Sequence, residues 1–156
     1  MGLYLRKAAE SDAETLFQWR NDPEARANSF HTEPIKLEEH IAWLSATLRD
    51  PAQEIFILCE GETPIGQVRL ATEGGAATVS YSIDAAYRVQ GYGKAILQLA
   101  ENLCVKSGKP LIMQGFVKKQ NVASQVIFEG LGYTKTEESE RNCLLYVKRI
   151  VNTDII

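Results

Sequence analysis

The 156-residue chain has few of the residues that build metal centres and disulfide frameworks, with only three cysteines and two histidines. Cys59, Cys104 and Cys143 lie far apart in apolar contexts, and no Cys-x-x-Cys pair occurs. This spacing lacks the paired ligands typical of a zinc site. An odd number of cysteines also argues against a disulfide framework. We therefore expect three reduced packing residues and no bound metal.

Long hydrophobic runs are absent too. No stretch approaches the roughly 20 apolar residues that a membrane-spanning helix needs. The segment 1–7 lacks the apolar region and cleavage site of a signal peptide. The sequence therefore predicts a cytoplasmic protein with no membrane partner. Its net charge of −3 argues against a general nucleic-acid binder, which would present a basic face.

The composition that remains is that of an ordinary globular domain, 45% hydrophobic and 24% charged. A chain of this length buries roughly two thirds of its unfolded surface without covalent crosslinks. No linker or internal repeat divides it. We therefore expect residues 1–156 to form a single domain.

Hydrophobic periodicity and turn residues predict a mixed α/β domain in the order β-α-α-β-β-β-α-β-α-β-β. The expected strands span 3–8, 54–60, 63–70, 76–83, 110–117, 133–138 and 142–149, and the expected helices span 11–20 and 37–48 and begin at Gly93 and Asn121. Ser11 and Glu14 match a capping box at the start of the first helix. In the second helix, Leu37, Ile41 and Leu44 belong to the apolar stripe that we expect to be buried, with Leu48 at its end.

The most informative segment lies between the strand at 76–83 and the helix that follows. It reads Arg88-Val89-Gln90-Gly91-Tyr92-Gly93-Lys94. The first turn of a helix leaves backbone N–H groups without partners, and the helix dipole makes that end attractive to anions. Gly91 and Gly93 keep β-carbons out of the way of an approaching phosphate oxygen, while Arg88 and Lys94 add positive charge. The loop is therefore expected to bind a pyrophosphate.

Two better-known glycine motifs do not fit this loop. A dinucleotide-binding Gly-x-Gly-x-x-Gly needs a third glycine where the chain has Ile96, and the Gly-Lys-Ser/Thr of a P-loop does not occur. A turn whose glycines only relieve steric crowding stays open as the simpler alternative.

The remaining pattern, Arg-x-x-Gly-x-Gly, resembles the coenzyme A loop of the GNAT family of N-acyltransferases. Downstream, residues 121–133 resemble the family's second motif, since Asn121, Ser124 and Gly132-Tyr133 fall at matching positions. The resemblance covers essentially the whole chain. It implies the GNAT fold, in which the fourth and fifth strands splay apart, with acetyl-CoA as the acetyl donor and a primary amine as the acceptor.

The same resemblance implies which residues contact the coenzyme. They are Tyr81, Ser82, Ile83, Arg88, Val89, Gln90, Gly91, Tyr92, Gly93, Lys94, Asn121, Ser124 and Phe128. Many relatives have a tyrosine as general acid at the position of Phe128, which has no proton to give. Ser124 is the first alternative, since ribosomal-protein N-terminal acetyltransferases of the family use a serine there, and Tyr133 is the second. Ser124 as an ordinary helix serine and Tyr133 as a core residue are the competing interpretations.

The acceptor amine must lose a proton before it attacks, so a carboxylate or an ordered water is needed nearby. Glu33 is the candidate base, with His31 and Glu73 considered by location, and each is equally compatible with a solvated loop side chain.

The segments 19–23 and 30–43 carry the information on the acceptor. They resemble GNAT domains of pseudaminic and related nonulosonic acid synthesis, which implies a nucleotide-linked amino-deoxy sugar. A looser resemblance points to a protein N-terminus or a small amine. Because Phe128 removes the usual acid, a non-catalytic acetyl-CoA-binding regulatory module is a further alternative. A monomer or a homodimer is expected, since exposed strand residues near the C-terminus could pair two chains.

Overall fold

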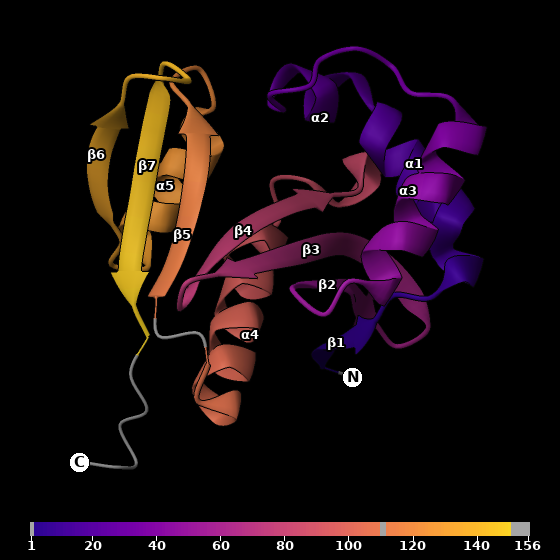
Figure 1. Cartoon of the computed structure of the whole chain (residues 1–156), viewed down its shortest axis with the longest axis horizontal. Coiled ribbons are helices and arrows are strands. Elements are labelled where there is room, and N and C mark those ends of the chain that lie inside the picture. Colours follow the sequence, from indigo (N-terminus) through magenta and orange to yellow (C-terminus); the bar gives the residue numbers. More distant parts are fainter. Residues whose placement is uncertain (1, 110–111, 151–156) are drawn as a thin grey trace.

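The described residues, 2–109 and 112–150 of a computed structural model, form one seven-stranded mixed sheet flanked by helices (Figure 1). The strands are β1 (Leu3–Lys7), β2 (Gln53–Glu60), β3 (Thr63–Glu73), β4 (Ala76–Ile83), β5 (Ile112–Lys118), β6 (Thr134–Glu138) and β7 (Cys143–Arg149). The helices are η1 (Glu10–Asp12), α1 (Ala13–Asn21), α2 (Pro23–Ala27), α3 (Leu37–Arg49), η2 (Ala85–Tyr87), α4 (Tyr92–Ser107) and α5 (Val122–Gly130).

The sheet has the order β1-β2-β3-β4-β5-β7-β6, and every neighbouring pair is antiparallel except β4 and β5. These two strands are parallel and pair only from Ala76 with Ile112 to Thr78 with Gln114. Beyond that point β4 and β5 diverge (Figure 1). The facing edges of the second half of β4 and of most of β5 are therefore not paired with each other. The divergence is the structural basis of the site described below.

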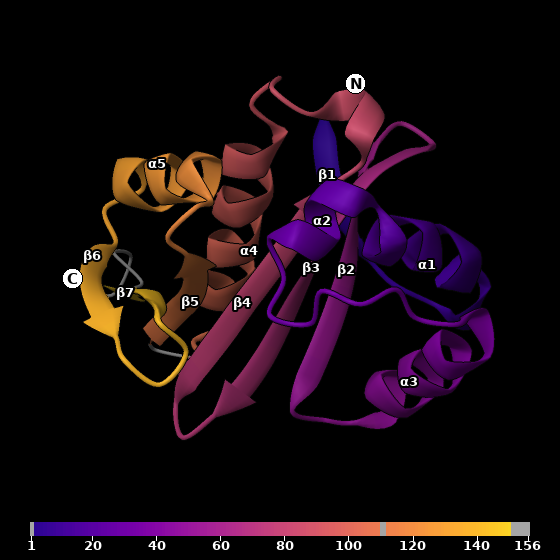
Figure 2. The ribbon, with the colours of Figure 1, turned by 90° about the horizontal axis from the view of Figure 1, so that it is seen from above.

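Helices cover both faces of the sheet (Figure 2). Helices α1 and α3 pack on one face, where Leu16, Trp19 and Leu44 contact Ile55 and Ile57 of β2. The opposite face packs against α4 in the larger core cluster. Strand residues alternate between the two faces, since successive side chains of a strand point to opposite sides.

The expected mixed α/β architecture is confirmed, with splayed fourth and fifth strands in the expected position. Helix α2 was not predicted. Asp22 caps it by accepting a hydrogen bond from the Ala25 N–H (3.0 Å), and Pro23 begins its first turn. The segments 110–111 and 151–156 lie outside the described residues, so the expected start of the fifth strand is not described.

Two local predictions are wrong. Ser11 does not cap the first helix: Asp12 accepts the Ala9 N–H (2.8 Å) and is held by Arg6, which places Ser11 inside η1. In α3, Leu37 and Ile41 are exposed, whereas Leu44 is buried with His40 and Thr47. The buried stripe of α3 is therefore rotated relative to the pattern of its apolar residues.

Candidate active site

The loop before α4 has the backbone of an anion site. Gly91 is the N-cap of α4 with φ +86°, and Val89 has φ +62° and is fully exposed. Left-handed residues within such a loop turn successive N–H groups toward one side, and the first turn of α4 adds unpaired N–H groups of its own. This backbone is compatible with phosphate binding, which stays a prediction for the loop.

The two glycines of the loop have different reasons to be glycine. A β-carbon on Gly91 would meet no atom within 4 Å, so its requirement is the positive φ. A β-carbon on Gly93 would lie 2.7 Å from Cδ1 of Ile127 on α5. Gly93 thus lets α4 and α5 approach closely, which differs from the predicted role of clearing space for a phosphate.

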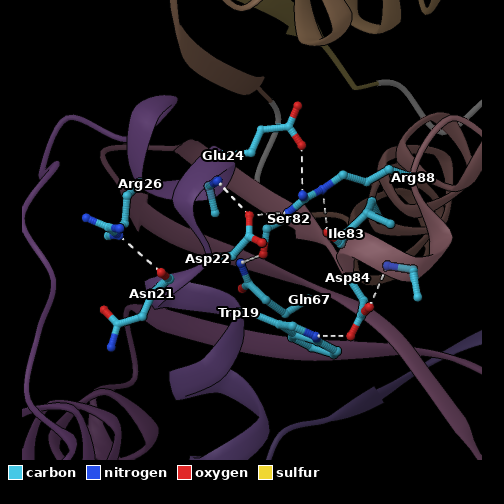
Figure 3. Close-up of polar contacts among 12 residues, drawn as sticks. Trp19, Asn21, Asp22, Glu24, Arg26, Gln67, Ser82, Ile83, Asp84 and Arg88 are labelled. Carbon is cyan, nitrogen blue, oxygen red and sulfur yellow. Dashed lines mark hydrogen bonds and ion pairs between the residues drawn. The ribbon is translucent and has the colours of Figure 1, made fainter.

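Arg88 directs its charge away from the loop. Its guanidinium pairs with Asp22 (2.6 Å) and Glu24 (2.7 Å), and its Nε donates to the Ile83 carbonyl (3.1 Å) (Figure 3). Burial would raise the pKa of Asp22, but the hydrogen bonds and charge of Arg88 help to lower it overall. Arg88 therefore joins the end of β4 to α2, while Lys94 stays exposed on the first turn of α4.

The diverging edge of β4 offers backbone groups to the space beside it. The Asp84 N–H donates to the Ile65 carbonyl (2.8 Å), and alternate residues of an antiparallel strand bond to the same neighbour. The N–H of Ile83 therefore points away from β3, toward the side from which β5 has separated. On the α1 side of the sheet, the Gln67 amide donates to Ser82 Oγ (3.1 Å).

A hydroxyl cluster lies at the start of α5. Asn121 caps this helix: its Oδ1 accepts the Ser124 N–H and its Nδ2 donates to Ser124 Oγ, both at 3.2 Å. The Tyr81 hydroxyl reaches from β4 to within 2.6 Å of Ser124 Oγ. Burial raises the pKa of Tyr81 more than the contact with Ser124 lowers it, so the phenol stays protonated at neutral pH.

The hydrogen-bond capacity of Ser124 limits how this cluster can work. A serine hydroxyl has two lone pairs and one proton. When Asn121 and Tyr81 both donate to Ser124 Oγ, both lone pairs are used and the serine proton is left for a third partner. The cluster thus orients one proton donor and places a second, Tyr81, directly behind it.

Phe128 and Tyr133 lie in the core beside this cluster. Phe128 stacks on Tyr146 (5.2 Å between ring centroids) and meets Tyr133 edge-on (4.9 Å). A β-carbon on Gly115 would lie 2.6 Å from Cζ of Phe128, so β5 has a glycine where this ring packs. The Tyr133 hydroxyl is buried next to Met113 Sδ (4.0 Å), and burial and then Glu101 raise its pKa.

The candidate bases are not brought together. Glu33 and His31 are both exposed in the loop between α2 and α3, where the His31 carbonyl accepts from Arg20 (3.2 Å). Glu73 lies at the far end of β3, paired with Ala76 at the opposite end of β4 from Ile83. Its position does not suit the predicted alternative role, because it lies at the opposite end of β4 from the Ile83 N–H.

Several contacts connect α2 and its following loop to the other half of the sheet. Lys118 Nζ and Gln120 Nε2 both donate to the Ala27 carbonyl (3.0 Å each). The Arg141 guanidinium lies over the rings of Phe116 (4.3 Å) and Phe30 (5.7 Å). On the other side, Trp19 Nε1 donates to Asp84 (2.8 Å) and fixes α1 at the end of β4 (Figure 3).

Within the described ranges, no helix has both the length and the apolar character needed to cross a membrane. No group of three or more His, Cys, Asp or Glu side chains is placed to hold a metal ion in the part of the chain that the structure describes.

A mixed sheet that opens beside a glycine-capped helix, with a hydroxyl cluster at the opening, is the architecture of an acyltransferase. The family model of the acetyltransferase (GNAT) domain matches residues 2–134. The chain therefore belongs to the GNAT family of N-acetyltransferases. No curated protein sequence shows significant similarity to it.

Solved structures share the whole fold. A domain from Methanocaldococcus jannaschii DSM 2661 has a TM-score of 0.83 at 21% identity, covering 95% of this chain and 98% of that one. RimL, a ribosomal L7/L12 alpha-N-protein acetyltransferase in complex with coenzyme A, has a TM-score of 0.82 at 19% identity, with 97% and 96% covered. AAC(6')-Ib in complex with ribostamycin and coenzyme A has a TM-score of 0.84 at 15% identity, with 96% and 94% covered.

Asn121 and Ser124, which the resemblance placed in one motif, are in contact, whereas the contacts of several other side chains were not predicted. The resemblance implied a coenzyme contact for Tyr81 but no contact with Ser124, and it did not predict that Arg88 pairs with Asp22 and Glu24. Asp22, Glu24 and the tyrosine on β4 were visible in the sequence, but only the fold shows what each one faces.

Proposed function

We propose that the protein transfers the acetyl group of acetyl-CoA to a primary amine of a small molecule, an amino-deoxy sugar in nucleotide-linked form. The observation that carries this proposal is the hydrogen-bonded set of Asn121, Ser124 and Tyr81 at the point where β4 and β5 diverge. It supplies a proton donor where the usual family tyrosine is replaced by Phe128.

The donor would be held by groups already in place. Residues 88–94 would bind the pyrophosphate through the N–H groups of the loop and of α4, and Asn121 would contact the pantetheine arm. Acetyl-CoA supplies an activated acetyl group and a thiolate leaving group that must gain a proton. The Ile83 N–H is placed to donate to the thioester carbonyl oxygen.

Proton delivery would run through two hydroxyls. Ser124 gives its proton to the departing sulfur and takes one from Tyr81, which recovers a proton from solvent after the products leave. The amine nitrogen loses its proton to a base, for which Glu33 remains the candidate, or to ordered water. Each proton that leaves the amine is thereby balanced by one delivered to the sulfur.

The contacts between α2 with its following loop and the other half of the sheet favour a small-molecule acceptor over a protein N-terminus. Lys118, Gln120 and Arg141 all connect α2 and its following loop to the other half of the sheet. A polypeptide acceptor needs an open path along which its chain can continue, and in this proposal these contacts close one side of the site to such a chain. AAC(6')-Ib, which shares this fold, has a structure in complex with ribostamycin and coenzyme A.

Two measurements test this proposal. Coenzyme A and acetyl-CoA should each raise the melting temperature, because they bind only the folded chain. Release of free thiol should then be followed with a panel of nucleotide-linked amino sugars, simple amines and peptides. No rise in melting temperature would remove the coenzyme site, and binding without turnover on any acceptor would instead favour a regulatory module.

The turnover test has matched variants. Ser124→Ala should lower kcat far more than it changes the affinity for coenzyme A. Tyr4→Phe is the control for loss of a tyrosine hydroxyl, since Tyr4 donates to the Gly61 carbonyl at 2.6 Å, far from the site in sequence and on the edge strand β1. Equal rates for Ser124→Ala and the parent chain would remove Ser124 as the acid.

A further inference from the structure

Three arginines are grouped around Arg20 and are called here the arginine row: Arg69 on β3, Arg20 on α1 and Arg26 on α2. All three are half-buried, and none makes a salt bridge to an acidic group among residues 2–109 and 112–150. Burial and then the charge of Arg20 lower the pKa of Arg69, and burial and then the charge of Arg26 lower the pKa of Arg20. Arg20 therefore lies near both of the others, and its guanidinium and that of Arg26 bond to the adjacent carbonyls of His31 and Thr32.

Two of the other half-buried cations in the described ranges have acidic partners, whereas Lys118 donates only to the Ala27 carbonyl (3.0 Å). Arg88 pairs with Asp22 at 2.6 Å, and Lys148 pairs with Glu101 at 3.0 Å. A partly buried charge is costly unless an opposite charge is near, so the unpaired row stands out against this background.

The row is held in place by neutral contacts. The Arg69 guanidinium lies over the Trp43 ring at 5.3 Å. Arg20 donates to the His31 carbonyl (3.2 Å), and Arg26 donates to the carbonyls of Asn21 (3.0 Å) and Thr32 (3.4 Å). These contacts fix the side chains but leave their charges without a counter-ion.

Arg69 lies on the same face of the sheet as Gln67 and Ser82, and Ser82 adjoins Ile83 at the proposed transfer site. Val68 and Leu70 belong to the core on the α4 side, so Arg69 between them points to the opposite face. Gln67, on the same face, bonds to Ser82 (Figure 3). Arg69 is two residues from Gln67, or about 7 Å along the strand. This distance suits an acceptor whose anionic group lies a few bonds from its reacting amine.

We infer that the arginine row binds a phosphate group of the acceptor, with Arg69 as its central residue. The inference rests on the proposed function, since it assigns a subsite to the acceptor of that reaction. Guanidinium groups bind phosphate oxygens in pairs of charge-assisted hydrogen bonds, which explains three arginines in place of lysines. An acceptor with several ammonium groups, such as an aminoglycoside, would be repelled by the same row.

Inorganic pyrophosphate is the probe for this subsite. Calorimetric titration is done with saturating coenzyme A, so that the loop at residues 88–94 is already filled. We expect one site whose affinity falls about 10- to 100-fold in Arg69→Gln, the loss of one charge-assisted pair. Arg49→Gln, an exposed residue of α3, is the matched control and should bind as the parent chain does. Arg20→Gln is a second variant in case Arg69→Gln does not fold.

Kinetics give a second readout and separate the two proposals. Pyrophosphate should compete with the acceptor but not with acetyl-CoA, and Arg69→Gln should raise the acceptor KM while leaving kcat nearly unchanged. Comparing an amino sugar with its 1-phosphate and its nucleoside diphosphate form shows which phosphate is bound.

Pyrophosphate binding that neither arginine variant weakens, or no binding at all, would overturn the subsite even if amino sugars are acetylated. Binding that depends on Arg69 in a protein without turnover would support the subsite and refute the acetyl transfer.

Discussion

Replacing Tyr81 by phenylalanine removes a single oxygen atom, the one that lies 2.6 Å from Ser124 Oγ. The ring of Tyr81 packs edge-on against Phe128 with 6.4 Å between centroids, and a phenylalanine ring keeps that contact. The variant therefore tests the proton path with little disturbance of the core. The lost hydrogen bond should lower the free energy of unfolding by about 1 kcal/mol.

The effect on catalysis should be larger than the effect on stability. General acid catalysis contributes roughly 10²- to 10⁴-fold to a rate. Ser124→Ala removes the donor itself and should lose all of that contribution. Tyr81→Phe leaves the serine proton in place but removes the group that replaces it, so we expect kcat to fall about 10²-fold, or about 2.7 kcal/mol in activation free energy.

The double variant is the decisive measurement. If Tyr81 acts only through Ser124, the variant that lacks both hydroxyls should be no slower than Ser124→Ala alone, because the two residues form one path. Thiol release gives kcat, and calorimetry gives the coenzyme affinity, which should change less than about threefold because the loop at residues 88–94 and the Ile83 N–H are unaltered. Independent, multiplying losses, or a Tyr81→Phe variant as fast as Tyr4→Phe, would refute the relay.

Three further predictions concern packing, charge and pH. Gly115→Ala should lower the free energy of unfolding by about 1–3 kcal/mol in urea titrations, because the new methyl group would lie 2.6 Å from Phe128 Cζ; an unchanged midpoint would contradict this packing. Arg88→Gln should raise the acceptor KM more than the coenzyme dissociation constant. Asp22 already neutralises the charge of Arg88, so that charge contributes little to binding the coenzyme phosphates. A loss mainly in coenzyme affinity would show that Arg88 contacts the phosphates. Burial and then the charge of Arg20 hold the pKa of His40 below its usual value, so the folded chain keeps it neutral while the unfolded chain protonates it below about pH 6.5. Stability should therefore fall as the pH drops from 6.5 to 5, by up to about 1.4 kcal/mol per unit, and His40→Leu should flatten this slope in urea titrations.

Much of the fold was predictable, because long periodic segments carry their own signal. The helix α4 and the hairpin of β2 and β3 follow from apolar spacing and from Gly61 in the turn. Helix α2 has only five residues, too few for a periodic pattern, although Asp22-Pro23 is a recognisable helix start. The rotated face of α3 depends on which side chains meet α1, and no local pattern records that choice.

The site was predictable only where its residues are neighbours in sequence. Asn121 and Ser124 lie three positions apart at one helix start, so their contact follows from helix geometry. Tyr81 lies 43 residues from Ser124, and their contact depends on how β4 and α5 are placed by the sheet between them. The pairing of Arg88 with Asp22, 66 residues away, was hidden for the same reason.

The short pairing of β4 with β5 leaves two strand edges inside the molecule. Exposed edges on the outside of a sheet invite other chains to add to them, which leads to aggregation. Here the free edges face each other between helices, where a slender extended ligand fits more easily than a folded neighbour. A ligand seated there would take the place of a missing strand, and its footprint should appear as slowed amide hydrogen exchange at Tyr81 and Ile83. The sheet would thus become continuous between β4 and β5 only when the acetyl donor is bound.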